Sequence, residues 1–278
     1  MNPNPLKQYF RQPAIYIRLP SQGNFYGEGA LAATANGEYP VLPMTTMDEI
    51  TYRTPDALFN GQAVVSVIQS CVPNILDAWH MPILDLDTVL IAIRIATYGH
   101  EMDINTTCPA CSTEADFGLD LRAVLEQIQP GDFGQPFRMG DLEIFIGPVT
   151  YQQINQNSIA QFEDQKLLRA LDDAALTPEQ KMQHISDALK NITTMTIRTL
   201  AQHIRLIKTP QAMVTELEHI IEWLTNANRA DYARIRDFVI GNKERSEVKP
   251  LPVTCPNCSH QYQQTFTLDM SNFFADAS

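Results

Sequence analysis

The sequence predicts an α+β fold that is mainly helical and carries a small β element. Three observations lead to this fold class. Apolar residues recur at helical spacing through the middle of the chain, between helix-start and helix-stop signals. The first 50 residues instead contain six prolines and only short apolar runs, which favours strands over long helices. Two C-x-x-C pairs stand far apart, at Cys108/Cys111 and Cys255/Cys258, and we interpret them as the halves of a split zinc ribbon with four cysteine ligands.

The composition is that of a globular protein. The chain has 278 residues, of which 44% are hydrophobic and 19% are charged, enough for one large domain or two modest ones. No apolar run approaches the ~18 residues that a membrane span requires. The first residues show no signal-peptide pattern. We therefore expect a soluble protein made in the cytoplasm.

The net charge of −12 is unevenly distributed along the chain. Residues 1–150 contain 7 Lys and Arg against 17 Asp and Glu, whereas residues 151–278 contain 13 against 15. An acidic surface is repelled by a phosphate backbone, so nucleic acid is a poor partner for the first half. The charge pattern favours protein partners.

Residues 1–53 are predicted to form an extended N-terminal arm, rich in Pro and Gly, with short strands. The apolar runs lie at residues 15–17, 19–26 and 39–43. Such an arm could lie on a neighbouring subunit or pack on its own domain, because ordered termini of both kinds occur. Residues 13–43 are therefore one candidate docking surface.

Residues 54–149 are predicted to be a helical core that contains the first C-x-x-C pair. We call each such pair, with the residues between its cysteines, a knuckle. A helix is expected to begin at Thr54–Pro55 and end at Cys71, and a second is expected from Asp85 or Asp87 to Tyr98, with Gly99 as its C′ residue. The second helix is apolar nearly all round, so we expect it at the centre of the core.

Three further features complete the predicted core. Arg94, the charged exception on the second helix, needs solvent or an acidic partner, for which Asp85 and Asp87 are candidates. A short helix is expected over residues 121–128. A β-hairpin is expected over residues 137–146, turning at Gly140–Asp141.

Residues 150–249 are predicted to be a helical insertion of four helices. The first is capped by Thr150 and extends to about Asp173, and the second begins in a capping box at Thr177 and extends to Ile207, with a possible break at residues 193–194. A third is expected from Thr209–Pro210, and a last one over residues 229–240, ending at Gly241. The apolar stripe over residues 213–224 is a second candidate docking surface, although it fits ordinary core.

Residues 250–278 are predicted to carry the second knuckle and the strand that closes the ribbon. Both knuckles read Cys-Pro-x-Cys-Ser, then a polar stretch, then Phe-x-Leu-Asp-(Leu/Met). Four thiolates form the closed tetrahedral shell of structural Zn²⁺. The alternatives are disulfides and a redox pair. A reducing compartment disfavours disulfides. A redox pair would need a helix that begins directly after the knuckle, which neither knuckle offers.

Other residues near the predicted zinc site have weaker claims as ligands. His100 or His260 could replace one cysteine, but four thiolates already satisfy the ion. The fifth cysteine, Cys71, lies in an apolar run and is interpreted as a small buried hydrophobe.

The sequence predicts no catalytic site and no organic cofactor. It contains no phosphate-binding loop, dinucleotide-binding glycine motif, H-E-x-x-H or G-x-S-x-G pattern. The pairs Asp85/Asp87 and Asp172/Asp173 fit helix ends better than paired catalytic acids. The remaining histidines fall on separate elements and fit structural roles: His80, His184, His203 and His219.

A nucleic-acid-binding zinc ribbon is the sharper alternative, and the charges oppose it. Such modules display Arg, Lys and aromatic residues around the knuckles. Residues 251–270 contain no basic residue, and the first knuckle is flanked by four acidic ones: Glu101, Asp103, Glu114 and Asp116.

Three stretches carry a resemblance to a known family. They are Leu-Pro-Ser-Gln-Gly-Asn-Phe-Tyr at residues 19–26, Pro-Met-Thr-Thr-Met-Asp-Glu at residues 43–49, and residues 86–99, which end in Ile-Arg-Ile-Ala-Thr-Tyr-Gly and lead into the first knuckle. Together they resemble the T4-type baseplate hub protein family of contractile-tailed bacteriophages. The likeness covers roughly residues 15–125 and the second knuckle, and it leaves the helical insertion unmatched.

The resemblance implies a non-enzymatic virion protein of the tail baseplate, made in the host bacterial cytoplasm. Its partners would be other baseplate or tail proteins, or further copies of itself, without nucleic acid or membrane. Two hypotheses follow: a structural hub component that stays in the particle, and an assembly chaperone that leaves it. The zinc-ribbon nucleic-acid binder is a third.

Overall fold

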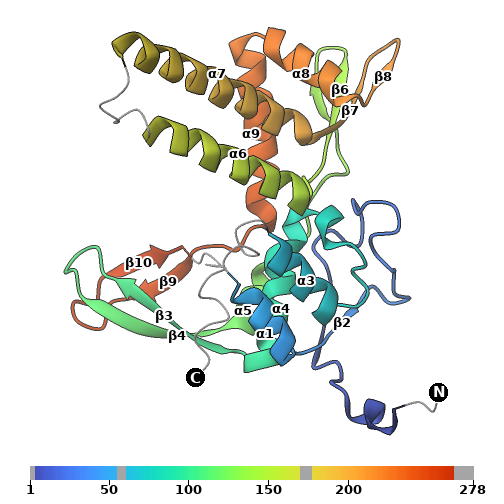
Figure 1. Cartoon of the computed structure of the whole chain (residues 1–278), viewed down its shortest axis with the longest axis vertical. Coiled ribbons are helices and arrows are strands. Elements are labelled where there is room, and N and C mark those ends of the chain that lie inside the picture. The colour runs from blue at the N-terminus through green and yellow to red at the C-terminus, as the bar shows by residue number, and fades with distance from the viewer. Residues whose placement is uncertain (1–3, 55–60, 170–176, 266–278) are drawn as a thin grey trace. The chain divides into compact units, whose positions relative to one another are not determined.

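The computed structural model describes residues 4–54, 61–169 and 177–265. It has a mixed α+β fold, as predicted, and divides into two compact units (Figure 1). The first unit joins residues 1–130 to residues 245–278, and the second comprises residues 131–244. The four-part division expected from the sequence is finer and stays a prediction. Among the described helices, none is long and apolar enough to cross a membrane.

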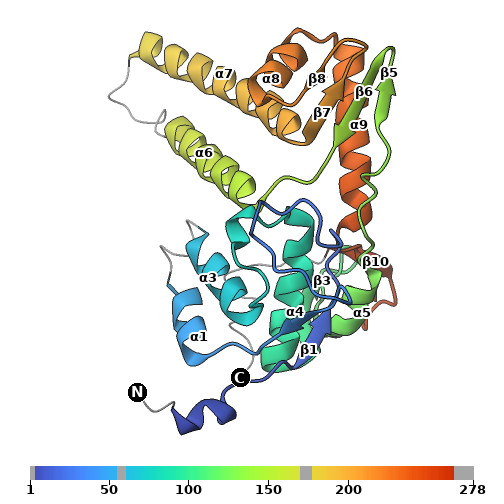
Figure 2. The same ribbon diagram turned by 90° about the vertical axis from the view of Figure 1, so that its right-hand side faces the viewer.

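The first unit packs short helices around one central helix, α4 (Figure 2). Its helices are α1 (Thr46–Tyr52), α3 (Gln62–Cys71), α4 (Leu86–Tyr98) and α5 (Leu121–Gln127), with short 3-10 helices η1 (Pro5–Tyr9), η2 (Ala78–His80) and η3 (Ile83–Asp85). Strands β1 (Ile15–Ile17) and β2 (Tyr39–Val41) pair antiparallel, and Ile17 and Val41 are buried. The strands of the predicted arm therefore pack on their own unit.

Helix α4 is the centre of the first core, as its sequence predicted. Residues 89–93 are all fully buried, and the helix ends at Tyr98, followed by Gly99, whose φ of +93° favours glycine. Arg94 is also buried, and its guanidinium lies 5.7 Å from the centre of the Tyr98 ring. Asp85, one of its two predicted partners, instead accepts hydrogen bonds from Ser21 and Tyr26.

Two helix boundaries in the first unit differ from the prediction. Helix α1 lies within the predicted arm and was missed, because the surrounding prolines outweighed its capping box, in which Thr45 and Asp48 satisfy each other's backbone N–H. Helix α3 ends at Cys71 as predicted but begins after Gly61 in the described residues. Of the predicted start at Thr54–Pro55, Pro55 lies outside them.

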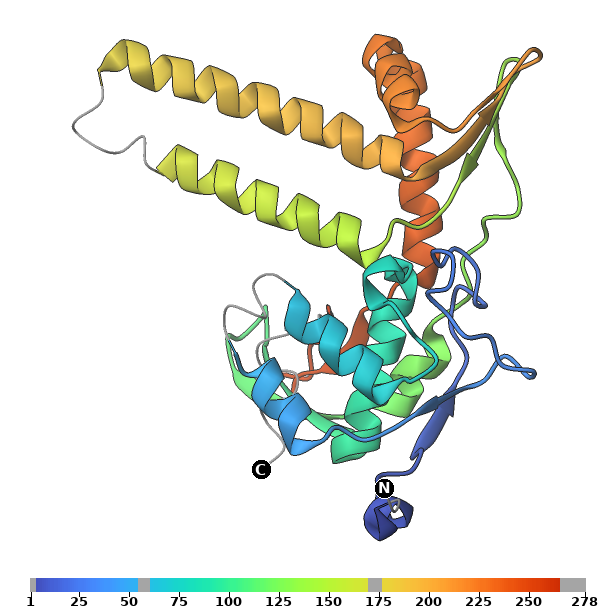
Figure 3. The same cartoon turned by 45° about the vertical axis from the view of Figure 1, so that its right-hand side comes forward.

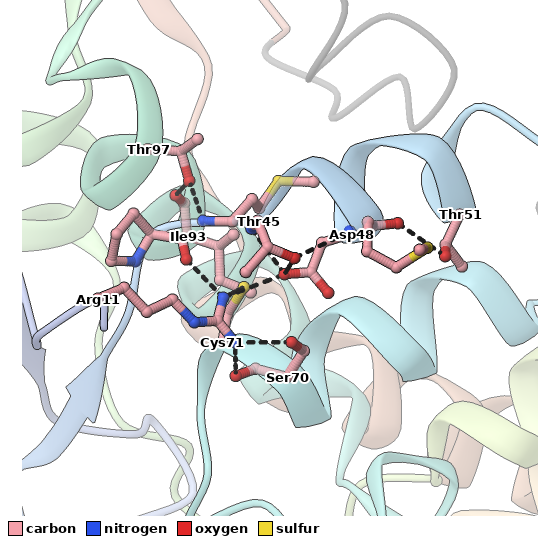
Figure 4. A network of polar contacts seen from close by, with 11 residues as sticks. Arg11, Thr45, Asp48, Thr51, Ser70, Cys71, Ile93 and Thr97 are labelled. Atoms are coloured by element: carbon pink, nitrogen blue, oxygen red, sulfur yellow. Dashed lines mark hydrogen bonds and ion pairs between the residues drawn. The ribbon is translucent and has the colours of Figure 1, made fainter. Parts of the chain in front are cut away.

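Arg11 fixes the N-terminal segment to two helices (Figure 4). Its Nη1 donates to the Pro43 carbonyl at 2.6 Å and the Asp48 carboxylate at 3.0 Å, and its Nη2 donates to the Ser70 carbonyl and hydroxyl, both at 2.7 Å. Burial raises the pKa of Asp48, but hydrogen bonds from Thr45 and Ser70 and the charge of Arg11 outweigh it and lower the pKa overall. The carboxylate therefore stays ionised and joins Arg11 to the start of α1.

Asp85 holds the loop at residues 21–26 against the start of α4. Its carboxylate is fully buried and accepts from the Ser21 N–H at 2.7 Å, the Ser21 hydroxyl at 2.6 Å and the Tyr26 hydroxyl at 3.0 Å. Burial raises its pKa, the hydrogen bonds from Ser21 and Tyr26 lower it, and the net pKa is about 6. The hydrogen bonds therefore offset only part of the free-energy cost of burying the charged carboxylate.

The second unit combines a four-stranded antiparallel sheet with four helices (Figure 3). The strand order is β5-β6-β7-β8, from β5 (Phe137–Met139), β6 (Leu142–Ile146), β7 (Ile204–Lys208) and β8 (Met213–Val214). The helices are α6 (Tyr151–Arg169), α7 (Pro178–Gln202), α8 (Leu217–Asn226) and α9 (Arg229–Ser246), of which α9 extends two residues into the first unit. The predicted hairpin at Gly140 is confirmed, and its strand β6 pairs with β7.

Four expectations for the second unit were wrong. Residues 204–208 form strand β7, so α7 ends at Gln202, and α7 continues through residues 193–194 without a break. The helix expected from Thr209–Pro210 begins only at Leu217, after strand β8. Helix α9 continues through Gly241 to Ser246. Helix α6 ends at Arg169 within the described residues, so its expected end at Asp173 lies outside them.

The second core explains why β7 is a strand. Ile204 and Ile207 of β7 are buried beside Ile144 of β6, in a cluster completed by α7, α8 and α9. By pairing with the hairpin, residues 204–208 gain backbone hydrogen bonds to a neighbouring strand. The spacing of apolar residues along the chain cannot predict such a tertiary contact. Ile220 and Leu224 are buried in this cluster, whereas Met213 is 68% exposed, so most of the stripe over residues 213–224 is core.

We expect Arg11→Ala to destabilise the first unit by about 2–3 kcal/mol, because it removes the charged partner of the buried Asp48 carboxylate and the side-chain donor to two carbonyls. The matched control is Arg18→Ala, which removes an exposed ion pair to Glu38 and should cost below about 0.5 kcal/mol. Urea unfolding followed by Trp79 emission, in a Trp223→Phe background, measures both. Equal midpoints for the two variants would contradict the anchoring role of Arg11.

We also expect a pH-dependent stability from Asp85. Because its folded pKa of about 6 exceeds its unfolded value, the folded state binds the extra proton, and stability falls as pH rises through about 6. The free energy of unfolding of the native protein, relative to Asp85→Asn, should drop by about 1 kcal/mol between pH 5 and pH 7.5. The same Trp79 assay at several pH values measures this difference, and parallel curves for the two proteins would refute it.

Candidate metal centre

Each C-x-x-C knuckle connects the two strands of a β-hairpin in the first unit. The first joins β3 (Glu101–Thr107) to β4 (Glu114–Asp120), and the second joins β9 (Leu251–Thr254) to β10 (Gln261–Gln264). The returning strand that the repeated pattern predicted is therefore present after both knuckles. The second Phe-x-Leu-Asp stretch lies outside the described residues.

The two knuckles have the same backbone hydrogen bonds. In each, the N–H of the first cysteine donates to the residue five positions later, Cys108 to Thr113 at 2.9 Å and Cys255 to His260 at 2.9 Å. The serine after the second cysteine donates back to the first, at 2.9 Å from Ser112 and 3.0 Å from Ser259. Both serines have positive φ, 56° and 58°. The repeated Cys-Pro-x-Cys-Ser pattern thus specifies a repeated, tightly constrained turn.

The knuckles bring all four predicted cysteines together. Their sulfur atoms lie within 4.8 Å of one another, with Cys108 3.7 Å from Cys258 and Cys111 3.6 Å from Cys255. A tetrahedral ion with metal–sulfur bonds of about 2.3 Å requires sulfurs about 3.8 Å apart. A disulfide would need about 2.05 Å, and all four cysteines are free. The donor set and spacing therefore fit a metal ion better than a pair of disulfides.

The pKa values of two of the four thiols are shifted in opposite directions. Hydrogen bonds with the Thr113 hydroxyl and backbone lower the pKa of Cys111 to about 6. At Cys258 the backbone N–H of His260 lowers the pKa, but its hydrogen bonds with neighbouring thiols and its desolvation raise it to about 12 overall. A bound cation would stabilise the thiolate form of its cysteine ligands.

Polar side chains join the two hairpins around the cysteines. The Asn257 amide donates to the Thr113 hydroxyl at 3.1 Å and lies 3.8 Å from the Cys111 sulfur, and the hydroxyls of Thr106 and Tyr262 are 2.6 Å apart. Sequence reasoning missed these contacts. The sequence could have indicated these contacts only through the position of the two residues next to the cysteines. Asn257 is the variable residue of Cys-Pro-x-Cys, and Thr113 follows the serine of the first knuckle.

The other candidate ligands do not join the cluster. Within the described residues it contains only cysteines, so neither His100 nor His260 belongs to it. The ring of His260 instead stacks on Tyr262, with centroids 6.2 Å apart. Cys71 is fully buried beside Arg11, which fits its interpretation as a small core residue. His203 is hydrogen-bonded to the Gly147 carbonyl, the structural role expected of it.

The arrangement of the four cysteines could hold a metal ion in a closed shell. Four sulfur donors would fill a tetrahedral shell and leave no position for a substrate or an activated water. Cys108 and Cys255 are buried, Cys111 is half-buried and Cys258 is exposed. The acidic residues Glu101, Asp103, Glu114 and Asp116 on the adjoining strands are exposed. The surface around the cysteines is thus unsuited to a phosphate backbone.

The comparison with protein families gives a match over most of the chain. The model of the family described as T4 bacteriophage base plate protein matches residues 33–275, a range that includes both knuckles and all of the second unit. No curated protein and no solved structure matches the chain.

We expect the purified protein to bind about one zinc ion per chain, since one closed set of four thiolates is present. Cys108→Ser should lose the metal because it removes a buried ligand. Cys71→Ser is the matched control, since it changes a buried thiol outside the cluster, and should keep it. Elemental analysis of protein purified without chelator measures the content. Equal metal content in both variants would show that the four cysteines do not form the site.

Proposed function

This chain belongs to the T4 bacteriophage base plate protein family, and from that premise we propose that it is a non-enzymatic structural component of the baseplate hub. Family membership implies a place in the virion tail and contacts with other phage structural proteins. The finer assignment, a hub protein of a contractile tail that takes part in baseplate assembly, is our proposal. The observation that carries it is the family match across residues 33–275, and the resemblance of residues 19–26 and 43–49 to hub proteins adds to it.

We further propose that the four cysteines hold a structural Zn²⁺. Zinc is the ion that most readily accepts four thiolates in a closed tetrahedron. Cys108 and Cys111 precede the second unit in sequence, and Cys255 and Cys258 follow it. The ion would therefore tie together the two chain segments that make up the first unit. Such ions contribute folding free energy directly, on the order of 10 kcal/mol in small domains.

Two other functions compete with this one. An assembly chaperone would have the same fold and the same contacts but would be absent from the mature particle. A nucleic-acid-binding ribbon would need cations around the knuckles, where the described surface is acidic. No described feature favours either over a structural component.

We expect mass spectrometry of purified phage particles to detect the protein in the tail. Its absence from mature particles, combined with its presence in assembly intermediates, would support the chaperone instead. We expect Cys255→Ser to reduce incorporation, because it removes a buried ligand and destabilises the first unit, while Cys71→Ser is incorporated normally. If Cys255→Ser were folded and incorporated at the native level, the structural role of the cysteine cluster would be wrong.

A further inference from the structure

A cavity of about 510 Å³ opens in the second unit between three helices. Helices α6 and α7 lie side by side, and α9 crosses near the C-terminal end of α7 (Figures 1 and 3). The cavity lies on the same face of α7 as a stripe of exposed residues, described below. We call the cavity and this stripe together the α7 groove.

Large aliphatic side chains form the floor of the cavity. Leu200 and Val239 are buried at its base, while Ile192 of α7 and Ile240 of α9 are each 44% exposed. The cost of leaving such side chains in water is recovered when a partner covers them. This part of the molecule therefore has the composition of a binding surface.

The apolar surface continues along α7 beyond the cavity. Met182 is 69% exposed, Ile185 is 39% exposed and Leu189 is 59% exposed, and with Ile192 they repeat at intervals of three and four residues. From residue 182 to residue 200 this face is about 27 Å long at about 1.5 Å per residue. A face of that length matches several turns of another helix, the recognition mode in which an amphipathic helix lies in a groove.

The charges of the groove select the partner. Arg236 and Lys243 line the cavity part of the groove from α9, and none of the described residues that line this cavity is acidic. Burial lowers the pKa of His203, so this third basic residue is neutral at neutral pH. Arg236 also contacts Asp237, at 2.7 Å, but that carboxylate is not part of the lining. The groove therefore presents cations beside an apolar floor.

A second copy of this chain fits that charge poorly. Among the described helices, the longest exposed apolar face of a second copy would be its own α7 stripe, since α1 exposes Met47 and Ile50 over only seven residues. The charged residues next in sequence to Met182 and Leu189 are Lys181 and Lys190. Asp187 is engaged by Gln183 on the same helix, at 3.1 Å. Two such stripes would bring lysines toward Arg236 and Lys243, which is unfavourable.

We infer that the α7 groove binds an amphipathic helix of another protein, one whose apolar anchors are flanked by carboxylates. The inference rests on the proposed function only in taking that protein to be another baseplate component. Binding itself is measurable on the isolated chain, so it can fail without affecting the evidence for incorporation into particles.

The test uses the full chain and two labelled helical peptides of about 18 residues, which span the groove. Both peptides carry the same Leu and Ile anchors at i, i+3, i+4 and i+7, flanked by Glu in one and by Lys in the other. Fluorescence anisotropy should show binding of the Glu peptide, weakened by added salt, and at least about tenfold weaker binding of the Lys peptide.

Matched variants locate the binding site on the protein. Lys243→Glu and Arg236→Glu, both at exposed positions of α9, should together weaken binding of the Glu peptide about tenfold or more. Lys7→Glu changes an exposed lysine of η1 that is not part of the α7 groove and should leave the affinity unchanged. Circular dichroism checks that each variant is folded.

Three outcomes would overturn the inference. The first is equal affinity for the two peptides, or binding of neither. The second is an unchanged affinity in the doubly reversed variant. The third is a concentration-dependent dimer in sedimentation that Arg236→Glu abolishes, since it would show that the groove binds a second copy.

Discussion

The first unit depends on contact between four sulfur atoms that are distant in sequence. Cys108 and Cys258 are 150 positions apart, and the whole second unit lies between them. Closing a loop of this length costs conformational entropy. The β9–β10 hairpin can offset little of this cost by burying apolar side chains. Apart from the knuckle, its buried apolar residues are Leu251 and Val253. The metal ion that we propose for this cluster would supply a strong interaction where the hydrophobic core is thin.

The rest of the first unit meets a related problem with buried polar side chains. Residues 4–43 contain two three-residue strands and one short 3-10 helix, so most of their backbone lacks ladder or helix hydrogen bonds. Arg11 and Asp85 compensate, each making several hydrogen bonds to groups distant in sequence. Satisfying buried backbone groups in this way lets an irregular, proline-rich segment pack as tightly as a regular one.

The sequence specified some of these features and left others undetermined. Helix α4, the short helix α5, the Gly140 hairpin and the meeting of four cysteines follow from local rules: apolar periodicity, capping residues and repeated motifs. Strand β7 does not, because its pairing with β6 is a tertiary contact that overrides helical spacing. Gly241 predicted the end of α9 wrongly, because one glycine lowers the stability of a helix only modestly and α9 continues through it. In the site, the ligands were predictable from spacing, whereas the contacts of Asn257 and Thr113 required knowing that the two knuckles face each other.

Both units leave large apolar side chains exposed, and the second unit is distinguished by having several of them aligned along one helix. In the first unit the polar groups of the cysteine cluster are satisfied within the chain, since the four thiols face one another and Thr113 and Asn257 bond across the hairpins. In the second unit, four large aliphatic residues along one face of α7 remain at least 39% exposed, beside two cations of α9. A closed thiol cluster adds stability without needing a partner, whereas an exposed apolar groove gains stability only when one arrives. Residues 1–150 are strongly acidic and residues 151–278 are nearly neutral, so an acidic partner would be repelled less by the second half of the chain than by the first. This charge difference supports the proposal that such a partner binds the α7 groove, while the proposed metal ion would stabilise the first unit.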